Sequence, residues 1–422
     1  MVEKFSAPKG VSEYFPPRGR DFETAIEKLL EPVRSAGYQL IELPIFEDTE
    51  LFTRGVGGST DVVTKEMYTF QDRAGRSLTL RPEGTAGVAR SVIEHGLERG
   101  QLPIKVFYKG PFFRAERPQA GRYRQFFQVG IEAIGADDPA LDAEVIYIAH
   151  RALQNLGLKN FTLKISSLGD GESRSKHRIE LVKFISHIDL DQESLDRVAK
   201  NPLRLFDDKR KEIIAAMESA PLIRDFLSPD SQENYESVKS HLRDLGIAYE
   251  EDPRMVRGLD YYTGTTFEFL HHGLGAQSAI GGGGRYDGLL QALGGSQLSG
   301  IGFGLGIDRA LLALDAEGIT LEQERSGLDL YLIPLSPASK ITSVALLAKL
   351  RESGLRVDMS YGDRGLKGAM KSADKQGAKF TLVLGDDELS SESVHVKNMA
   401  SGEVVSVKLS ASEISSFIKK MI

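Results

Sequence analysis

The chain of 422 residues contains no cysteine, so disulfide bridges, thiolate zinc sites and cysteine nucleophiles are excluded. It has no apolar run close to the ~20 residues that a membrane-spanning helix requires. Its first residues, MVEKFSAPKG, contain no apolar signal-peptide core. We therefore expect a cytoplasmic protein that does not enter a membrane.

Metal-binding patterns are also scarce. The eight histidines include no pair at the spacing that would place two ligands on one helix face. The adjacent His271 and His272 are predicted to lie at the surface rather than to bind a metal. The sequence therefore predicts no metal site built from protein side chains.

Neither common phosphate-binding loop is present. Glycines recur at every second position over residues 300–306, a spacing that fits neither G-x-G-x-x-G nor a P-loop. In a strand this period leaves one face bare, and a bare face admits a flat ring close to the backbone. Arg309 follows in the first turn of a predicted helix, where the macrodipole prefers an anion, so its guanidinium is available for phosphates. The glycine run 281–284 predicts a flexible turn that lets backbone approach a ligand, or else a plain hairpin.

Composition indicates an ordinary globular protein, with 41% hydrophobic and 27% charged residues. The length predicts two or three domains. The net charge of −7 does not by itself indicate nucleic-acid binding. Residues 328–422, however, carry 13 Lys plus Arg and 11 Asp plus Glu, so this segment is +2 while the remainder is −9.

The order of patterns along the chain predicts the domains. Strand and helix signals alternate irregularly up to about residue 169. A charge-dense, helical pattern then covers residues 170–250, as an inserted helical module would, and strand signals return over 251–325. A regular alternation of strands and helices follows over 328–422. We predict a core made of the first and third segments, interrupted by a helical insertion and followed by a small α/β domain.

Several predicted strands carry polar residues on one face. The strand expected over 123–135 places apolar residues on one side and both Gln128 and Glu132 on the other. Two further strand segments end near Glu83 and Arg114. A polar face on one strand is usually solvated, but carboxylates and guanidiniums on three strands favour one shared binding site.

The stretch RGLDYYTGTTFEF, residues 257–269, combines a half-buried strand with a charged lead-in. Arg257 stands beside Tyr261 and Tyr262, where a guanidinium is costly to desolvate unless a partner neutralises it. The residues alone leave this partner unidentified, and a salt bridge to Asp260 is one candidate.

Taken together, these motifs resemble the histidyl-tRNA synthetases of the bacterial type over essentially the whole chain. FFRAERPQAGRYRQFFQ resembles the second signature of class II synthetases, GIGFGLGIDRALLAL the third, and GYQLIELPIFEDTELF the first, which in that family builds the dimer interface. RGLDYYTG and GGGGRYDGL resemble the two peptides peculiar to histidyl enzymes, and TLRPEGT resembles their amino-acid-binding loop.

The resemblance implies an α+β fold with an antiparallel sheet of six or seven strands flanked by helices, a helical insertion near the acceptor stem and a C-terminal α/β anticodon-binding domain. It implies a homodimeric histidine–tRNA ligase whose substrates are L-histidine, ATP with Mg²⁺, and tRNA(His). The implied reaction forms histidyl-adenylate from histidine and ATP and then transfers the histidyl group to the 3′ end of the tRNA. No editing domain is expected, because paired ring contacts can reject analogues by roughly 10⁴ to 10⁵.

The resemblance also implies the site residues. Arg257 is implied to meet the amino-acid carboxylate and α-phosphate, where other class II enzymes place a metal, and it is predicted to be catalytic together with Arg114 and Arg309. The implied histidine-binding residues are Glu83, Gly84, Thr85, Gln128, Glu132, Tyr261, Tyr262 and Tyr286. The implied ATP-binding residues are Arg114, Glu116, Arg122, Phe126 and Arg309. Phe127 replaces a histidine of some relatives, but its parity directs it away from the site.

A basic stripe marks the C-terminal segment. Arg364, Lys367, Lys371 and Lys375 follow at spacings of 3, 4 and 4, which predicts one face of a helix. Within a domain that resembles an anticodon-binding module, these residues are predicted to bind tRNA.

Two alternatives remain. A non-catalytic regulatory subunit of ATP phosphoribosyltransferase shares the core but lacks the C-terminal domain and degrades the RGLDYY peptide. A synthetase for glycine, threonine or proline lacks RGLDYY and the Glu132 pocket. The C-terminal segment, the RGLDYY peptide and Glu132 are all present in this chain. Amino-acid-dependent pyrophosphate exchange into ATP distinguishes a histidyl-tRNA synthetase from these two alternatives.

Overall fold

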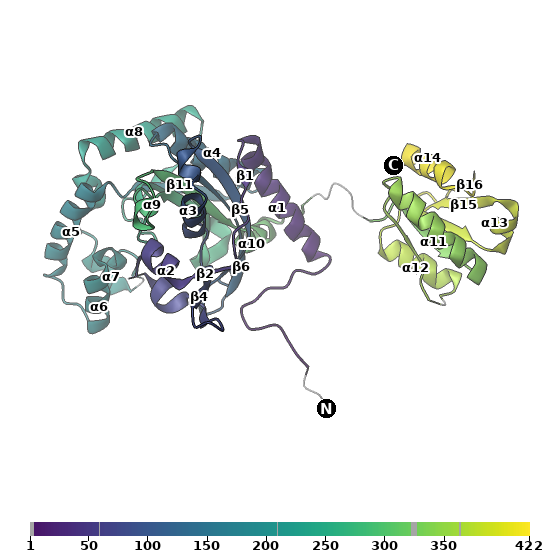
Figure 1. The fold of residues 1–422 in the computed structure, drawn as a ribbon, viewed down its shortest axis with the longest axis horizontal. Helices are drawn as coiled ribbons and strands as arrows, with labels where there is room; N and C mark the ends of the chain where they lie inside the picture. The colour runs from purple at the N-terminus through teal and green to yellow at the C-terminus, as the bar shows by residue number, and fades with distance from the viewer. Residues whose placement is uncertain (1–3, 59, 209, 322–326, 363) are drawn as a thin grey trace. The chain divides into compact units, whose positions relative to one another are not determined.

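The computed structural model describes residues 4–58, 60–208, 210–321, 327–362 and 364–422. The chain divides into two compact units, Met1–Leu321 and Glu322–Ile422 (Figure 1). The predicted end of the core at residue 325 lies outside the described residues.

The first unit is built on an eight-stranded sheet with the order β1-β5-β6-β11-β10-β9-β7-β8. Its strands are β1 (Gln39–Leu40), β5 (Ile104–Phe113), β6 (Gln125–Ile134), β7 (Phe161–Ser167), β8 (Glu250–Glu251), β9 (Thr263–His271), β10 (Ala279–Arg285) and β11 (Gly300–Gly306). The six long strands run antiparallel, as predicted, whereas the short edge strands β1 and β8 pair in parallel. The sheet is therefore mixed, because long connections let the chain return to each edge in the parallel direction: the three-stranded sheet and α3 precede β5, and the helical insertion precedes β8.

The glycine run 281–284 is not a flexible turn, which corrects the sequence prediction. It lies in β10, hydrogen-bonded between β11 and β9. A Cβ added at Gly283 would overlap the carbonyl oxygen of Gly302 and stand 2.8 Å from the Cα of Phe303. The glycines are needed because two backbones approach too closely for a side chain, and the partners on both sides fix the run in place.

One face of the sheet carries the main core. Helices α1 (Arg18–Ser35), α4 (Pro139–Asn155), α8 (Pro229–Asp244) and α10 (Ile307–Glu317) enclose apolar side chains there. The apolar face of β6 packs into this cluster through Val129, Ile131 and Ala133. Phe127 lies against the cluster too and contacts the rings of Tyr14 and Phe22, which confirms that it points away from the polar face.

The opposite face has a smaller core and leaves room for a site. Helices α3 (Thr85–Glu94) and α9 (Leu289–Ala292) share an apolar cluster with Tyr108, Phe112 and Tyr286. A three-stranded sheet, β2 (Phe46–Asp48), β4 (Ser77–Leu80) and β3 (Thr69–Gln71), accompanies this side of the unit. Short helices complete the core: α2 (Thr49–Phe52), η1 (Thr53–Gly57), η2 (Val62–Glu66), η3 (Leu97–Arg99) and η6 (His272–Gln277).

The segment between β7 and β8 is helical, as predicted. It contains α5 (Gly171–Ile185), α6 (Gln192–Lys200), η4 (Pro202–Leu205), α7 (Lys211–Ala216), η5 (Ile223–Phe226) and α8. Side chains of α5, η4 and α7 form an apolar cluster of their own. Helix α8 instead packs Tyr235, Val238 and Leu242 into the main core. Figure 1 shows α5, α6 and α7 gathered at one side of the unit.

The second unit is a five-stranded sheet in the order β13-β12-β14-β15-β16 with helices around it. Its elements are β12 (Leu330–Pro334), α11 (Pro337–Glu352), β13 (Val357–Met359), α12 (Leu366–Lys375), β14 (Phe380–Leu384), α13 (Asp386–Ser391), β15 (Ser393–Asn398), β16 (Val404–Lys408) and α14 (Ala411–Met421). This matches the small α/β domain expected over 328–422.

His271 is buried, contrary to its prediction as a surface residue, whereas His272 is exposed. The His271 side chain bonds Glu317 through Nε2 at 3.0 Å and accepts from the backbone N–H of Gly273 at Nδ1. Alternation along β9 turns this end residue inward, and the buried carboxylate satisfies it.

Substitution of Gly283 by alanine should test the close approach of β10 and β11. The added methyl group meets backbone atoms that cannot move independently, so we expect a loss of about 3 kcal/mol of unfolding free energy. The urea midpoint, followed by far-UV circular dichroism, measures this loss.

Gly171→Ala is the matched control, because a Cβ there meets nothing within 4 Å. It should leave the midpoint unchanged or slightly higher. Equal midpoints for both variants would contradict the packing described for Gly283.

Candidate active site

A cavity of about 220 Å³ lies on the polar face of the sheet. Every residue that the sequence analysis assigned to histidine or ATP lines it: Glu83, Gly84, Thr85, Arg114, Glu116, Arg122, Phe126, Gln128, Glu132, Arg257, Tyr261, Tyr262, Tyr286 and Arg309. Phe126, Gln128 and Glu132 reach it because alternate residues of β6 face the same side. The structure thus brings these residues together, while their individual roles stay predictions.

Glu132 is buried at the closed end of the cavity. The Thr85 hydroxyl donates to its Oε1 at 2.7 Å, while its Oε2 has no hydrogen-bond partner among the described residues. The Tyr286 hydroxyl is likewise buried and interacts with the Glu132 carboxyl group, but it has no hydrogen bond of standard geometry in the described chain. Burial raises the pKa of Glu132 to about 8. An open carboxyl oxygen and an open hydroxyl can satisfy a ligand that both donates and accepts hydrogen bonds.

The alternating glycines of β11 make room for these side chains. A Cβ at Gly300 would overlap the ring of Tyr286, and one at Gly302 would overlap Glu132. At these two positions the bare face therefore admits the protein's own side chains, which refines the expectation that it admits a ligand ring. Gly304 and Gly306 line the cavity directly.

Glu83 is held rigidly at the start of α3. Its two carboxylate oxygens accept the backbone N–H groups of Thr85 at 2.7 Å and Ala86 at 3.0 Å, and Tyr261 donates to it at 3.3 Å. Burial raises the pKa of Glu83, and the two backbone donors oppose that rise. The result is a carboxyl group of fixed orientation at the edge of the cavity, suited to a ligand ammonium group.

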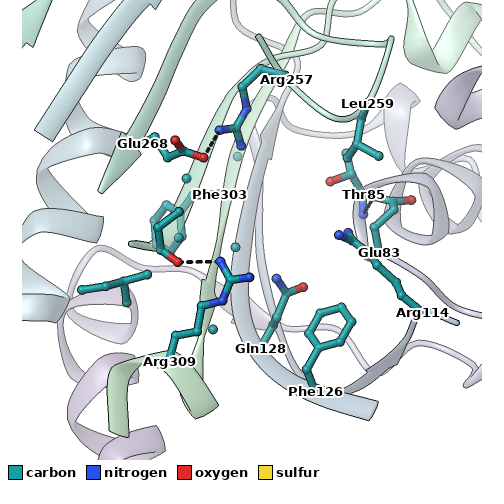
Figure 2. Close-up of a pocket in the computed structure, with 18 of the residues that line it drawn as sticks. Glu83, Thr85, Arg114, Phe126, Gln128, Arg257, Leu259, Glu268, Phe303 and Arg309 are labelled. Carbon is teal, nitrogen blue, oxygen red and sulfur yellow. Dashed lines mark hydrogen bonds and ion pairs between the residues drawn. The ribbon is translucent and has the colours of Figure 1, made fainter. Parts of the chain in front are cut away.

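Arg257 projects into the cavity from the loop before β9. Its Nη1 donates to Oε1 of Glu268 at 2.9 Å (Figure 2). Its guanidinium carbon lies 5.1 Å from the ring centroid of Tyr262. Its Nε is buried and has no partner among the described residues. Asp260, the alternative partner considered from the sequence, accepts a hydrogen bond from Asn201 at 3.4 Å.

The sequence analysis missed Glu268. The available signal was its position on β9 between the buried Phe267 and Phe269, because a lone charged residue in such a strand must face the side opposite to the core. Tyr108 was also missed. Its ring occupies the space that Gly84 and Gly130 leave, since a Cβ at either glycine would overlap it.

The open end of the cavity is rich in guanidinium groups. Arg309 donates to the carbonyl oxygens of Gly121 and Ala279, both at 2.7 Å, and Arg114 donates to Pro82 at 3.0 Å. Burial and then the charge of Arg114 lower the pKa of Arg309. Neither arginine has a carboxylate ion-pair partner in the part of the chain that is described, so an anionic ligand would relieve their mutual repulsion.

Arg122 differs because it forms ion pairs with Glu116 and Glu66. The Arg114 guanidinium carbon lies 5.3 Å from the ring centroid of Phe126. Figure 2 shows Arg114, Phe126 and Gln128 near one another below the Arg257 loop. A flat ring stacked on Phe126 would therefore lie close to the guanidinium of Arg114. A nucleotide would suit this arrangement, because it has a flat base and negatively charged phosphates.

Within the described residues no group of three or more His, Asp or Glu side chains could hold a metal ion. Carboxylates such as Glu116 and Glu268 do line the cavity individually. This donor set fits Mg²⁺ that is bound mainly by substrate phosphates with one or two carboxylates, rather than by a protein cage.

The predicted tRNA-binding residues lie in the second unit. Lys367, Lys371 and Lys375 are exposed at successive turns of α12. Arg364 precedes the helix, and its Nη1 donates to the Ser372 hydroxyl at 2.8 Å. The stripe therefore comprises three lysines on α12 and one arginine folded back onto it, which corrects the expected placement of Arg364 on the helix.

No helix among the described residues has the length and apolar character required to cross a membrane.

Comparison with protein families gives two matches. The model described as histidyl-tRNA synthetase matches residues 10–170 and 173–310, and the model described as anticodon binding domain matches residues 329–421. A curated histidine–tRNA ligase of Saccharopolyspora erythraea is 58% identical over 402 residues, covering 95% of this chain and 96% of its own length. That of Nocardia farcinica is 59% identical over 408 residues, covering 97% and 96%.

Solved structures agree. Apo histidyl-tRNA synthetase of S. aureus matches with a TM-score of 0.83 and 40% identity, covering 99% of both chains. A Bacillus halodurans structure described as an ATP phosphoribosyltransferase regulatory subunit/histidyl-tRNA synthetase matches with a TM-score of 0.63 at 23% identity, over 91% of this chain and 99% of its own. This second likeness concerns the fold alone.

Substitution of Glu132 by glutamine should change how stability depends on pH. A glutamate ordinarily ionises near pH 4.5, whereas burial raises the pKa of Glu132 to about 8. Between these values the folded protein keeps a proton that the unfolded chain releases, so wild-type stability falls as pH rises. Glu132→Gln removes this loss, and its urea midpoint relative to wild type should increase from pH 5 to pH 9.

Glu212→Gln, which changes an exposed carboxylate on α7, is the control and should show no such gain. A pH-independent difference between Glu132→Gln and wild type would contradict a buried, protonated Glu132.

Proposed function

The chain belongs to the histidyl-tRNA synthetase family, and we propose that it activates L-histidine with ATP and transfers the histidyl group to the 3′ end of tRNA(His). The main structural support is the cavity: among the described residues, Glu132 Oε2 and the Tyr286 hydroxyl have no hydrogen bond of standard geometry at one end, and Arg114 and Arg309 have no ion pair at the other. The regulatory-subunit alternative is disfavoured by the high identity and coverage of the ligase relatives and by the C-terminal match to an anticodon-binding domain.

The closed end suits the imidazole ring. A neutral imidazole has one donor and one acceptor nitrogen, and the open Oε2 of Glu132 and hydroxyl of Tyr286 can pair with both. Tyr262 would complete the ring contacts. Glu83, Thr85 and Gln128 would bind the α-amino group, with Glu83 held in orientation by the start of α3.

Activation requires a carboxylate oxygen of histidine to attack the α-phosphorus of ATP. The bond from that phosphorus to the bridging oxygen breaks, and pyrophosphate leaves with the electron pair. Negative charge accumulates on the phosphoryl oxygens during this step. We assign Arg257 and Arg114 to neutralise it, because both are fixed in the cavity before the reaction begins. Arg309 and Arg122 would bind the outer phosphates.

The adenine ring would lie on Phe126 and contact Glu116, which must then exchange part of its pairing with Arg122 for the ligand. Mg²⁺ would enter with ATP and supply further neutralisation of phosphate charge. In the second step the 3′-terminal ribose hydroxyl of tRNA attacks the histidyl carbonyl, and AMP leaves.

The remaining parts of the proposal concern partners. We assign Arg364, Lys367, Lys371 and Lys375 to the phosphates of tRNA, because the three lysines are exposed on α12. We assign the surface with Leu40, Ile45, Phe46 and Phe70 to a homodimer interface, because these apolar side chains are 42–54% exposed. Both nucleic acid and ATP are available in the cytoplasm, where we place the reaction.

The decisive assay is exchange of labelled pyrophosphate into ATP with each amino acid in turn. Only histidine should support exchange. Arg257→Ala should lower the exchange rate by about 10²- to 10³-fold, because a preorganised cation at the reacting phosphate is lost, while the histidine dissociation constant changes far less.

Arg254→Ala is the matched control for this experiment. Arg254 lies three residues earlier but does not line the active-site cavity, so exchange should stay within about twofold of wild type. A comparable loss of rate and of histidine affinity in Arg257→Ala would make Arg257 a binding residue only.

The role of α12 is tested by the salt dependence of tRNA binding. Lys371→Ala should weaken binding and reduce the slope of log K against log salt by about one, because one phosphate contact is removed. Lys408→Ala, an exposed lysine on β16, should leave the slope unchanged. An unchanged slope in Lys371→Ala would remove Lys371 from the interface.

A further inference from the structure

A second cavity, of about 310 Å³, is lined by residues of the same two peptides that supply Tyr262 and Tyr286 to the active site. Thr263, Arg285 and Asp287 line this cavity, and none of these three lines the active-site cavity. We name it the acidic cavity because five aspartates line it: Asp137, Asp142, Asp170, Asp230 and Asp287. The steps described above leave Thr263, Arg285 and Asp287 without a role.

The two peptides meet where the pairing of β9 with β10 is irregular. Gly284 pairs with Thr266, but the next residue of β10, Arg285, pairs with Thr263, so the register shifts between them. Gly264 lies within the shift and has a φ of +44°, a conformation that glycine tolerates best. Such irregularities interrupt the ladder of backbone hydrogen bonds and redirect side chains. The backbone ladder alone therefore does not fix how the two peptides lie against each other.

A reciprocal side-chain contact joins the peptides at this point. The Thr263 hydroxyl donates to Oδ2 of Asp287 at 3.2 Å and accepts the backbone N–H of Asp287 at 3.0 Å. Thr263 directly follows Tyr262, and Asp287 directly follows Tyr286. The contact therefore links the residues next to the two tyrosines, and Thr263 is only 6% exposed, so water does not readily replace it.

Arg285 anchors the same contact to the core. Its Nε donates to both carboxylate oxygens of Asp142 on α4, at 2.8 and 2.9 Å, and its Nη1 donates to Oδ1 of Asp287 at 3.3 Å. Arg285 and Asp142 are both buried. A buried ion pair of this kind is strongly destabilised when one partner is removed, so its members hold their places firmly. Tyr286 is thus fixed by the residue before it and by the residue after it.

From these observations we propose that Thr263, Arg285 and Asp287 are positioning residues for histidine recognition. They touch no substrate, but they hold Tyr262 and Tyr286 in the orientation that accepts the imidazole ring. A recognition site requires its side chains to be held within about 0.5 Å of the productive geometry by the residues around them. This inference rests on the proposed function, because it takes the ligand of the two tyrosines to be the ring of histidine.

The test is made at Thr263, because valine keeps the shape of the side chain and removes only the hydroxyl. Thr263→Val should raise KM for histidine in pyrophosphate exchange by about tenfold, since a buried donor and acceptor of Asp287 lose their partner. KM for ATP should stay within about twofold of wild type. A purely structural role would lower the fraction of folded enzyme, and therefore the apparent kcat, without changing either KM.

Two further variants complete the comparison. Thr263→Ser retains the hydroxyl and should return KM for histidine to within about twofold of wild type. Thr162→Val, the control, removes a hydroxyl that bonds Nε2 of His272 at 3.0 Å on β7, and it should leave KM for histidine unchanged. Equal rises of KM for histidine and for ATP in Thr263→Val, or a Thr263→Ser variant as impaired as Thr263→Val, would overturn the assignment.

Inhibition by histidinol locates the effect on the ligand. In histidinol an alcohol replaces the carboxylate, while the ring and the amino group are those of histidine. Its inhibition constant against histidine should rise in Thr263→Val by the same factor as KM for histidine, because the loss concerns the ring. An unchanged inhibition constant would place the effect at the carboxylate and contradict the positioning of the tyrosines.

Two outcomes separate this inference from the proposed function. Absence of histidine-dependent exchange in the wild-type protein would refute the function itself. Normal exchange in wild type with an unchanged KM for histidine in Thr263→Val would refute the positioning role alone and leave the function standing.

Discussion

The cavity of the first unit depends on glycines at which neighbouring strands and side chains approach one another closely. Gly281 and Gly283 let β10 lie so near β11 that a Cβ at either position would overlap a carbonyl oxygen of β11, and Gly300 and Gly302 leave space for Tyr286 and Glu132. The polar face of a central sheet would otherwise be filled by its own residues. Here it becomes a cavity with a buried carboxyl group at its closed end, and burial holds that group protonated near neutral pH.

A second feature follows from the distribution of charge within the cavity. The carboxylate oxygens of Glu83 accept the first backbone N–H groups of α3, and Nη1 of Arg257 donates to Glu268, so both side chains are oriented before a ligand arrives. Arg114 and Arg309 are held by carbonyl oxygens, which position a guanidinium without neutralising it. Such preorganisation is favourable for a reaction that develops charge at phosphorus, because little reorganisation remains to be done.

The loop around Arg257 connects two parts of the molecule. On one side it lines the active-site cavity, and on the other it contacts the helical insertion through Arg174 and Asn201. These two hydrogen bonds tie the insertion to the loop that lines the active-site cavity.

Much of the site was predictable from the sequence because strand alternation is a local rule. The parity of β6 separates Gln128 and Glu132 from Val129 and Ile131, and the motifs around Arg114, Arg257 and Arg309 each contain their own signal. The helical insertion and the C-terminal α/β pattern were predictable for the same reason. Family resemblance supplied the roles of these residues, which periodicity alone does not contain.

Only the tertiary structure decided which groups meet across the chain. Glu268 as the partner of Arg257, the burial of His271 against Glu317 and the placement of a glycine run inside a central strand all depend on long-range pairing. The parallel edge strands β1 and β8 and the position of Arg364 outside α12 are of the same kind. Local sequence determines which face a side chain occupies, whereas its burial and its partner depend on which distant segment packs against that face.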